Sequence, residues 1–238
     1  MLRYIDHNTM GKAFHGWLQS YFHFSFADYY NPDNVNFGVL RVLNDDIIRP
    51  GTGFTPHPHK DMEIISYVVR GELSHKDSMN NSHTLTRGQI QYMSAGTGVV
   101  HSEMNDGVDE VRLMQMWILP DKTGYAPNYG DYRFEWDERI GKWMPIATSY
   151  DNTKSAAPIK IHADVNIYAA VVPANDSIDF EVGENRQAYL VLLEGDAKVE
   201  NIDLTERDAL EISGQDVSIT TGQGAHLYVV EMAYDQGR

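Results

Sequence analysis

The chain has 238 residues, of which 42% are hydrophobic, and carries a formal charge of −15. This length allows one large β domain or two small ones, each with a substantial core. The negative charge repels phosphate backbones and anionic membrane surfaces, so we expect no direct binding to nucleic acid or membranes. Cysteine is absent, which excludes disulfides, thiolate nucleophiles and Cys-type zinc sites.

The amino-terminal residues 1–7 lack the apolar run of a signal peptide. No apolar segment approaches the length of a bilayer span. With the lack of cysteine, these features predict a cytoplasmic protein.

The first predicted strands lie in a segment, residues 12–36, that is dense in aromatic side chains and histidines. Phe22, Phe24 and Phe26 occupy alternate positions, which is the period of a strand with one buried face. The next strand is predicted over residues 37–43, and we expect it to end at the turn-like run 44–46, Asn-Asp-Asp.

Short β-branched or apolar segments then follow at regular spacing, with glycines and prolines between them. The predicted strands are Met62–Val69, its hairpin partner Glu72–Lys76, Gln89–Met93, Val99–Glu103 and Arg112–Leu119. Many short strands of this kind, without a convincing amphipathic helix, predict an antiparallel barrel or jelly roll.

Residues 120–160 differ in composition, with prolines at 120, 127, 145 and 158, and we expect a long connection with little regular structure. The second half then echoes the first: residues 67–73 resemble 192–197, and 111–118 resemble 225–232. We therefore predict an all-β protein of two antiparallel β-barrel domains in tandem. Residues 1–130 would form the N-terminal domain and residues 131–238 the C-terminal domain.

Two short stretches of the first half carry candidate metal ligands. His57-Pro58-His59 and His101-Ser102-Glu103 each place two ligands at positions i and i+2, which leave a strand on the same face. Two such strands could hold one metal ion with His57, His59, His101 and Glu103. No His-x-His or His-x-Glu occurs after residue 140, so we expect no metal site in the second barrel.

Glu63 is a competing ligand, because it shares strand parity with His57 and His59. Parity does not separate the two glutamates. The donor set suits iron, manganese, cobalt, nickel, copper or zinc. Without thiolates, a closed structural zinc site is disfavoured.

The spacing of glycines, histidines and acidic residues resembles the two motifs of the cupin superfamily. The first motif is matched by Gly51, His57, His59, Glu63 and a slightly late Gly71, and the second by Gly96, Gly98, His101 and Asn105. The stretches 57–63 and 94–103 further resemble the signatures of the pirin family, as do 16–17, 23–30 and 115–118. The resemblance is specific over residues 14–120 and looser afterwards.

The pirin resemblance implies a bicupin whose metal, most simply Fe(2+), is held by His57, His59, His101 and Glu103. Glu63 would then be a hydrogen-bond partner that orients a histidine. The resemblance also implies quercetin 2,3-dioxygenase activity, in which a flavonol-like substrate is opened by O2 with release of carbon monoxide. Glu103 would act as the general base.

A second function, from a different class, is also implied by the resemblance: a redox-sensing regulator that acts through a protein partner. A third is an enzyme acting on another small oxygen-bearing metabolite. Four side chains could line a flat pocket, although each is also expected as ordinary barrel core: Phe22, Phe24, Met93 and Met104.

Overall fold

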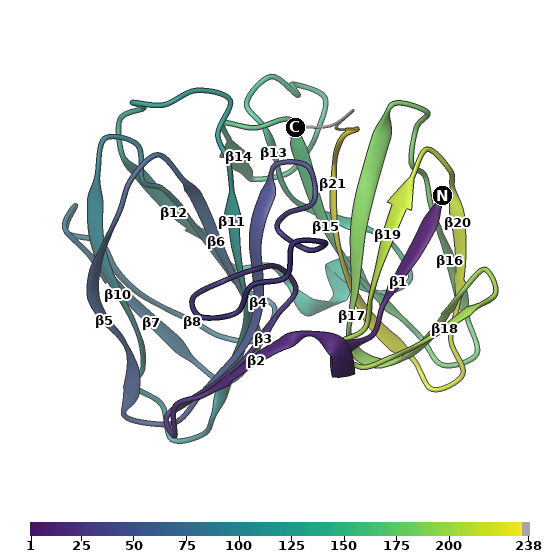
Figure 1. Ribbon diagram of the computed structural model, residues 1–238, viewed down its shortest axis with the longest axis horizontal. Helices are drawn as coiled ribbons and strands as arrows, with labels where there is room; N and C mark the ends of the chain where they lie inside the picture. The colour runs from purple at the N-terminus through teal and green to yellow at the C-terminus, as the bar shows by residue number, and fades with distance from the viewer. Residues whose placement is uncertain (235–238) are drawn as a thin grey trace. The chain divides into compact units, whose positions relative to one another are not determined.

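A computed structural model describes residues 1–234 and consists almost entirely of β-strands (Figure 1). Helical turns in the described residues are the 3-10 segments η1 (His7–Thr9) and η2 (Trp136–Arg139). Neither of them is long and apolar enough to cross a membrane. The all-β fold predicted from the strand pattern is confirmed.

The chain forms two compact units. The N-terminal unit comprises residues 10–134 with 161–163, and the C-terminal unit comprises residues 1–9, 135–160 and the chain from 164 onwards. The first nine residues belong to the C-terminal unit because β1 (Leu2–Ile5) pairs antiparallel with β19 (Ala209–Ser213). The domain limits at 130 and 131 stay a prediction.

The N-terminal unit contains two antiparallel sheets. The seven-stranded sheet has the order β12-β9-β6-β11-β4-β3-β2, and the four-stranded sheet has the order β5-β10-β7-β8. The strand bounds are β2 Gly11–Phe14, β3 Leu18–Phe22, β4 Leu40–Ile48, β5 Thr52–His59, β6 Glu63–Arg70, β7 Leu73–Asp77, β8 Ser82–Leu85, β9 Ile90–Ser94, β10 Val99–Asn105, β11 Val111–Ile118 and β12 Asn128–Tyr132.

An apolar cluster joins these two sheets. Ile48 and Val68 come from the large sheet, and Leu73 and Leu85 come from the small one. All four are fully buried, and burial of each stabilises the unit by roughly 1.5–3 kcal/mol relative to exposure. The two sheets therefore face each other across a common core.

Strand β4 does not end at residues 44–46, so that part of the prediction was wrong. The polar run stays in the sheet because distant partners satisfy it. Asp45 accepts hydrogen bonds from the guanidinium of Arg112, with Nε–Oδ1 at 2.8 Å and Nη2–Oδ2 at 2.6 Å. Asp46 accepts a short hydrogen bond from the Ser20 hydroxyl. A buried polar residue with a partner does not require a turn.

The predicted hairpin between β6 and β7 was also wrong, because β7 pairs with β8 and β10 in the other sheet. The chain changes sheets at Gly71, whose φ is +77°. A Cβ at Gly71 would lie 2.6 Å from the backbone oxygen of Glu110, so only glycine fits this crossing.

The aromatic strand is shorter than its alternation predicts. β3 ends at Phe22, and Phe24 is buried outside any strand. Beyond Phe22 the chain forms a loop held by Ser25, whose hydroxyl donates to the backbone oxygen of Asn31 at 2.9 Å. Alternation alone does not reveal this loop, because its side chains are buried as in a strand.

The C-terminal unit is built mainly on the long strand β17 (Arg186–Val199), which pairs with β19 and β21 in its first part and with β18 and β20 near its end. Its core includes Leu190, Leu192, Leu210, Leu227 and Val229, all fully buried. The remaining strands are β13 Met144–Ser149, β14 Ile159–Ile161, β15 Val165–Val172, β16 Ser177–Phe180, β18 Ile202–Thr205, β20 Val217–Thr220 and β21 Ala225–Ala233.

The segment 120–160 contains more regular structure than predicted, namely β12, η2, β13 and the start of β14. β12 adds an edge strand to β9, with Tyr129 opposite Met93, and β13 pairs with β15. Pro145 is tolerated inside β13 because the strand register shifts between Pro145 and Ala147, and the prolines at 120, 127 and 158 lie outside the strands.

Candidate metal centre and cavity

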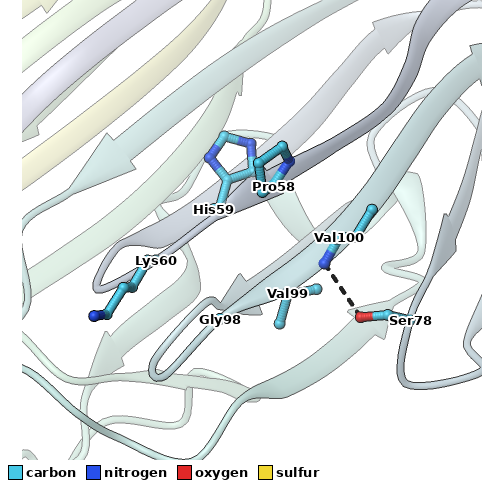
Figure 2. Close-up of a pocket in the computed structure, with 7 residues that line it drawn as sticks. All are labelled: Pro58, His59, Lys60, Ser78, Gly98, Val99 and Val100. Atoms are coloured by element: carbon cyan, nitrogen blue, oxygen red, sulfur yellow. Dashed lines mark hydrogen bonds between the residues drawn. The ribbon is translucent and has the colours of Figure 1, made fainter.

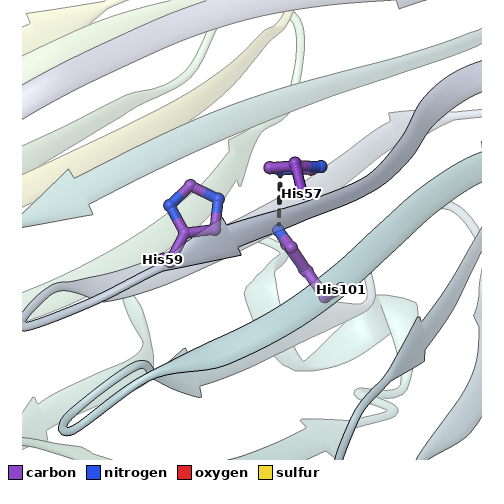
Figure 3. A group of neighbouring side chains, drawn as sticks. All are labelled: His57, His59 and His101. Atoms are coloured by element: carbon purple, nitrogen blue, oxygen red, sulfur yellow. Dashed lines mark hydrogen bonds between the residues drawn. The ribbon is translucent and has the colours of Figure 1, made fainter.

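The three motif histidines come together on neighbouring strands. β5 and β10 pair antiparallel with His101 opposite His57, and the register shifts between His101 and Glu103. Gly53 permits this close pairing, since a Cβ there would lie 2.3 Å from the backbone oxygen of Glu103. The imidazole centroids of His57 and His59 lie 4.8 Å apart, those of His57 and His101 4.6 Å, and those of His59 and His101 4.9 Å (Figure 3).

One hydrogen bond fixes the tautomer of His57. Its Nδ1 lies 2.7 Å from the backbone oxygen of Thr55, which can only accept, so Nδ1 carries the proton. The other ring nitrogen of His57, Nε2, lies 3.1 Å from Nε2 of His101 (Figure 3).

Electrostatics keep the other two imidazoles neutral. Burial, and then the neighbouring His101 and His57, lower the pKa of His59 to about 4. Burial, and then His57 and His75, lower the pKa of His101 to about 3. Neutral imidazoles are the form that ligates metals.

This geometry fits a metal ion. One ligand atom from each of the three histidines lies within 4.8 Å of the others. Metal–nitrogen bonds of about 2.0–2.1 Å at right angles place two ligand nitrogens roughly 3.0 Å apart, close to the 3.1 Å between His57 and His101. The carboxylate of Glu103 is not within that tight group, although it lines the same cavity.

Glu103 is almost fully buried and is held by three neutral donors. Its Oε1 accepts from the Ser66 hydroxyl and the Gln91 amide, both at 2.6 Å, and its Oε2 accepts from the Gln115 amide at 2.5 Å. These three hydrogen bonds fix the orientation of the carboxyl group.

The competing Glu63 lies elsewhere. The chain turns at Asp61 (φ +48°) after β5, so strand parity with His57 does not extend to Glu63, the first residue of β6. Its Oε1 accepts from the Ser94 hydroxyl at 2.7 Å and lies 3.3 Å from Nδ1 of His162. The histidine that Glu63 contacts is therefore His162.

A cavity of about 340 Å³ opens beside the histidines, within the size range of small-molecule sites. Aromatic side chains and polar groups from both sheets line it together. It is lined by Ala13, His15, Trp17, Leu18, Ser20, Phe22, Phe26, Ala27, Asn44, Asp46, Phe54, His57, His59, Glu103, Gln115 and Trp117. The cavity thus lies between the two sheets of the N-terminal unit.

Of the four side chains considered as pocket walls, Phe22 lines this cavity. Phe24 and Met93 are buried in the core, and Met104 is not in the lining. Sequence reasoning missed the polar residues Asn44 and Asp46, although their position inside an apolar strand was a signal that they face something polar.

The comparisons with known proteins agree with this architecture. The family model described as pirin matches residues 5–118, and one described as quercetinase C-terminal cupin domain matches residues 148–232. A pirin-like protein of Caulobacter vibrioides is 40% identical over 227 residues, covering 95% of this chain and 97% of its own. The chain belongs to the pirin family.

Two further pirin comparisons concern Escherichia coli. A quercetin 2,3-dioxygenase is 37% identical over 206 residues, covering 86% of this chain and 87% of its own. The crystal structure of bacterial pirin YhhW in complex with nickel(II) superposes with a TM-score of 0.91 at 32% identity, covering 99% of this chain and 100% of the other. The bicupin fold predicted from the internal echoes is thereby confirmed.

A second hollow of about 430 Å³ lies on this pirin at the ends of β5 and β10 (Figure 2). Its lining is Pro58, His59, Lys60, Ser78, Gly98, Val99 and Val100. The polar contact drawn there is the hydrogen bond from the Val100 backbone N–H to the Ser78 hydroxyl, at 3.1 Å. This hollow lacks the convergent ligands of the cavity.

The C-terminal unit also contains a group of potential ligands, Asp6, His7 and Asp208. Asp208 already accepts hydrogen bonds from the backbone and ring of His7, from the Tyr4 hydroxyl, and from the backbone and hydroxyl of Thr205. These contacts account for the group by hydrogen bonding alone. That the second barrel has no metal site stays a prediction.

Proposed function

We propose that this pirin is a metal-dependent dioxygenase of the quercetin 2,3-dioxygenase type. The observation that carries the proposal is the convergence of three imidazoles beside a cavity of about 340 Å³ that is lined partly by aromatic side chains. The E. coli relative named quercetin 2,3-dioxygenase supports the flavonol and O2 as reactants.

His57, His59 and His101 would hold one divalent ion, with Glu103 as a fourth ligand beside them. We propose iron(II), and metal analysis must separate it from nickel, the ion in the related E. coli structure, and from manganese, cobalt, copper and zinc. When bound, the ion would acidify the flavonol hydroxyl and supply a site for O2 next to it.

Glu103 would accept the proton of that hydroxyl. Its three donors and the bound ion would together fill the four lone-pair sites of the carboxylate, so one donor must turn away first. The Ser66 hydroxyl is the easiest to turn, because it rotates freely and also lies 3.1 Å from the side-chain oxygen of Gln115. The two glutamine amides would keep the carboxylate oriented during the transfer.

The aromatic walls would position a flat substrate and exclude water. Trp117 packs edge-on against His59 with centroids 4.9 Å apart, and Trp17 packs edge-on against Phe54 at 5.3 Å. A dry, rigid wall next to the ligands strengthens the electrostatic interactions at the reacting hydroxyl.

The test is oxygen uptake and carbon monoxide release with quercetin as substrate, using metal-loaded protein. We expect turnover that falls at least about a hundredfold in His57→Ala and Glu103→Ala. His83→Ala is the control, because His83 is exposed on β8 and is not among the residues that line the cavity. Metal-loaded protein without turnover of any flavonol would contradict the proposal and favour the regulatory alternative.

A further inference from the structure

Strand β4 presents two polar side chains to the cavity. Asn44 and Asp46 are two residues apart, so they leave the strand on the same face, and both line the cavity. They are 3% and 2% exposed. They belong to the seven-stranded sheet, whereas the histidines belong to the four-stranded sheet on the other side of the core.

Within the described residues, Asn44 is not satisfied and Asp46 has a single side-chain partner. The side-chain oxygen of Asn44 is buried and has no hydrogen-bond partner. The side-chain hydrogen bond of Asp46 is the one from Ser20 to Oδ1. A buried acceptor without a donor costs about 1–3 kcal/mol, so its retention calls for an explanation.

Asp45, the residue between them, shows that a buried polar side chain of β4 can find hydrogen-bond partners within the protein. Asp45 points to the opposite face and receives hydrogen bonds from Nε and Nη2 of Arg112. The missing partner, that of Asn44, therefore belongs to the face of β4 that lines the cavity. This contrast indicates that the partner of Asn44 comes from a molecule in the cavity, next to the carboxyl group of Asp46.

The unpaired oxygen of Asn44 requires a ligand that donates. A phenolic hydroxyl fits, since it can donate its one hydrogen to Asn44 while accepting from a protonated Asp46, or donate that hydrogen to an ionised Asp46. Burial, with Asp45 and Glu103 nearby, raises the pKa of Asp46 to about 7 against the opposing hydrogen bond from Ser20, so both states occur near neutral pH.

We propose that Asn44 and Asp46 form a second recognition site in the cavity that binds a hydroxyl group of the substrate other than the one presented to the histidines. The inference rests on the proposed function for the substrate class. It makes the cavity selective for polyhydroxylated aromatic molecules, because a ligand without that hydroxyl leaves the buried oxygen of Asn44 unpaired.

The test compares quercetin with 3-hydroxyflavone, which keeps the 3-hydroxyl and 4-carbonyl but lacks the other hydroxyls. Binding to metal-loaded protein is measured without oxygen. Wild type should bind quercetin roughly tenfold more tightly than 3-hydroxyflavone. Asp46→Ala and Asn44→Ala should remove most of that preference while changing 3-hydroxyflavone binding less than about twofold. Equal losses for both ligands, or an unchanged preference, would overturn the inference.

The controls separate this result from folding and from the proposed function. Asp46→Asn keeps an acceptor oxygen and should restore most of the preference, and the exposed Asp106→Ala should behave as wild type. A second pair, catechol and 1,2-dimethoxybenzene, is tested on metal-free protein by ligand-observed NMR. Catechol should bind more tightly, and the difference should vanish in Asp46→Ala. If neither flavonol binds but catechol shows this pattern, the proposed function fails and the recognition site stands. If catechol shows no advantage, the recognition site fails.

Discussion

Asp46 is a carboxyl group whose surroundings oppose its ionisation. It is buried, and Asp45 and Glu103 add negative charge near it, while the Ser20 hydroxyl acts in the opposite direction. Glu103 differs, because three donors from Ser66, Gln91 and Gln115 surround its oxygens. The two carboxyl groups of this cavity thus lie in different environments, which suits the two roles proposed for them: proton acceptance by Glu103 and hydroxyl recognition by Asp46.

This environment predicts a pH dependence of stability. The pKa of Asp46 rises from 3.8 to about 7 on folding. The folded state therefore binds more protons than the unfolded state between these values, so the stability of metal-free protein falls as the pH rises from about 4 to about 7. Asp46→Asn mimics the protonated acid and should remove up to roughly 4 kcal/mol of this loss.

Urea unfolding of wild type and Asp46→Asn at pH 4, 5, 6, 7 and 8 measures how the free energy of unfolding depends on pH. The free energies of unfolding of the two proteins should diverge in favour of the variant as the pH rises. Parallel profiles would show that Asp46 does not titrate in this range. Asp106→Asn serves as the exposed control.

At the scale of the element, β4 and β11 are joined by a buried ion pair as well as by their backbone ladder. Arg112 and Asp45 are 3% and 0% exposed, and Nη2 lies 2.6 Å from Oδ2. Asp45→Asn removes the charge that compensates the guanidinium and should cost about 3–5 kcal/mol of unfolding free energy.

The double variant Asp45→Leu, Arg112→Met tests the cause of that loss. Replacing both charges by apolar side chains removes the unpaired buried charge, so it should recover much of the stability lost in the single variant. The measurement compares the denaturant midpoints of wild type, Asp45→Leu, Arg112→Met and the double variant. If the double variant is destabilised by the sum of the two single replacements, the unpaired charge is not the reason for the loss.

The strands with simple patterns could be predicted from the sequence. Met62–Val69 corresponds to β6 and Val99–Glu103 to most of β10, because continuous or alternating apolar residues reflect burial directly. The continuation of β4 through Asn44-Asp45-Asp46 could not be predicted from the sequence, because the hydrogen-bond partners Ser20 and Arg112 are far away along the chain. The three histidines were predicted as neighbours because residues at positions i and i+2 of a strand leave it on the same face, which can be recognised from the sequence alone. The donors around Glu103 carry no such local signal.

At the scale of the whole molecule, the internal echo has a structural counterpart. Gly71 lies between β6 and β7, and Gly195 lies at the point where β17 changes its pairing. A Cβ at Gly71 would meet the backbone oxygen of Glu110, just before β11, and one at Gly195 would meet that of Gly224, just before β21. Both units thus place a glycine at the same crossing, while the histidine triad is present in the N-terminal unit.

The most direct test of the central claim is the metal content of the purified, reconstituted chain, measured together with its thermal unfolding. We predict one divalent ion per chain, and a stabilisation of about 2.7 kcal/mol at a free metal concentration one hundred times the dissociation constant. His57→Ala, His59→Ala and His101→Ala should each lose the ion and the stabilisation, whereas His83→Ala should keep both. Two results would contradict a metal site at the three histidines: wild-type protein that stays empty after reconstitution, or His57→Ala, His59→Ala and His101→Ala proteins that bind metal as tightly as wild type.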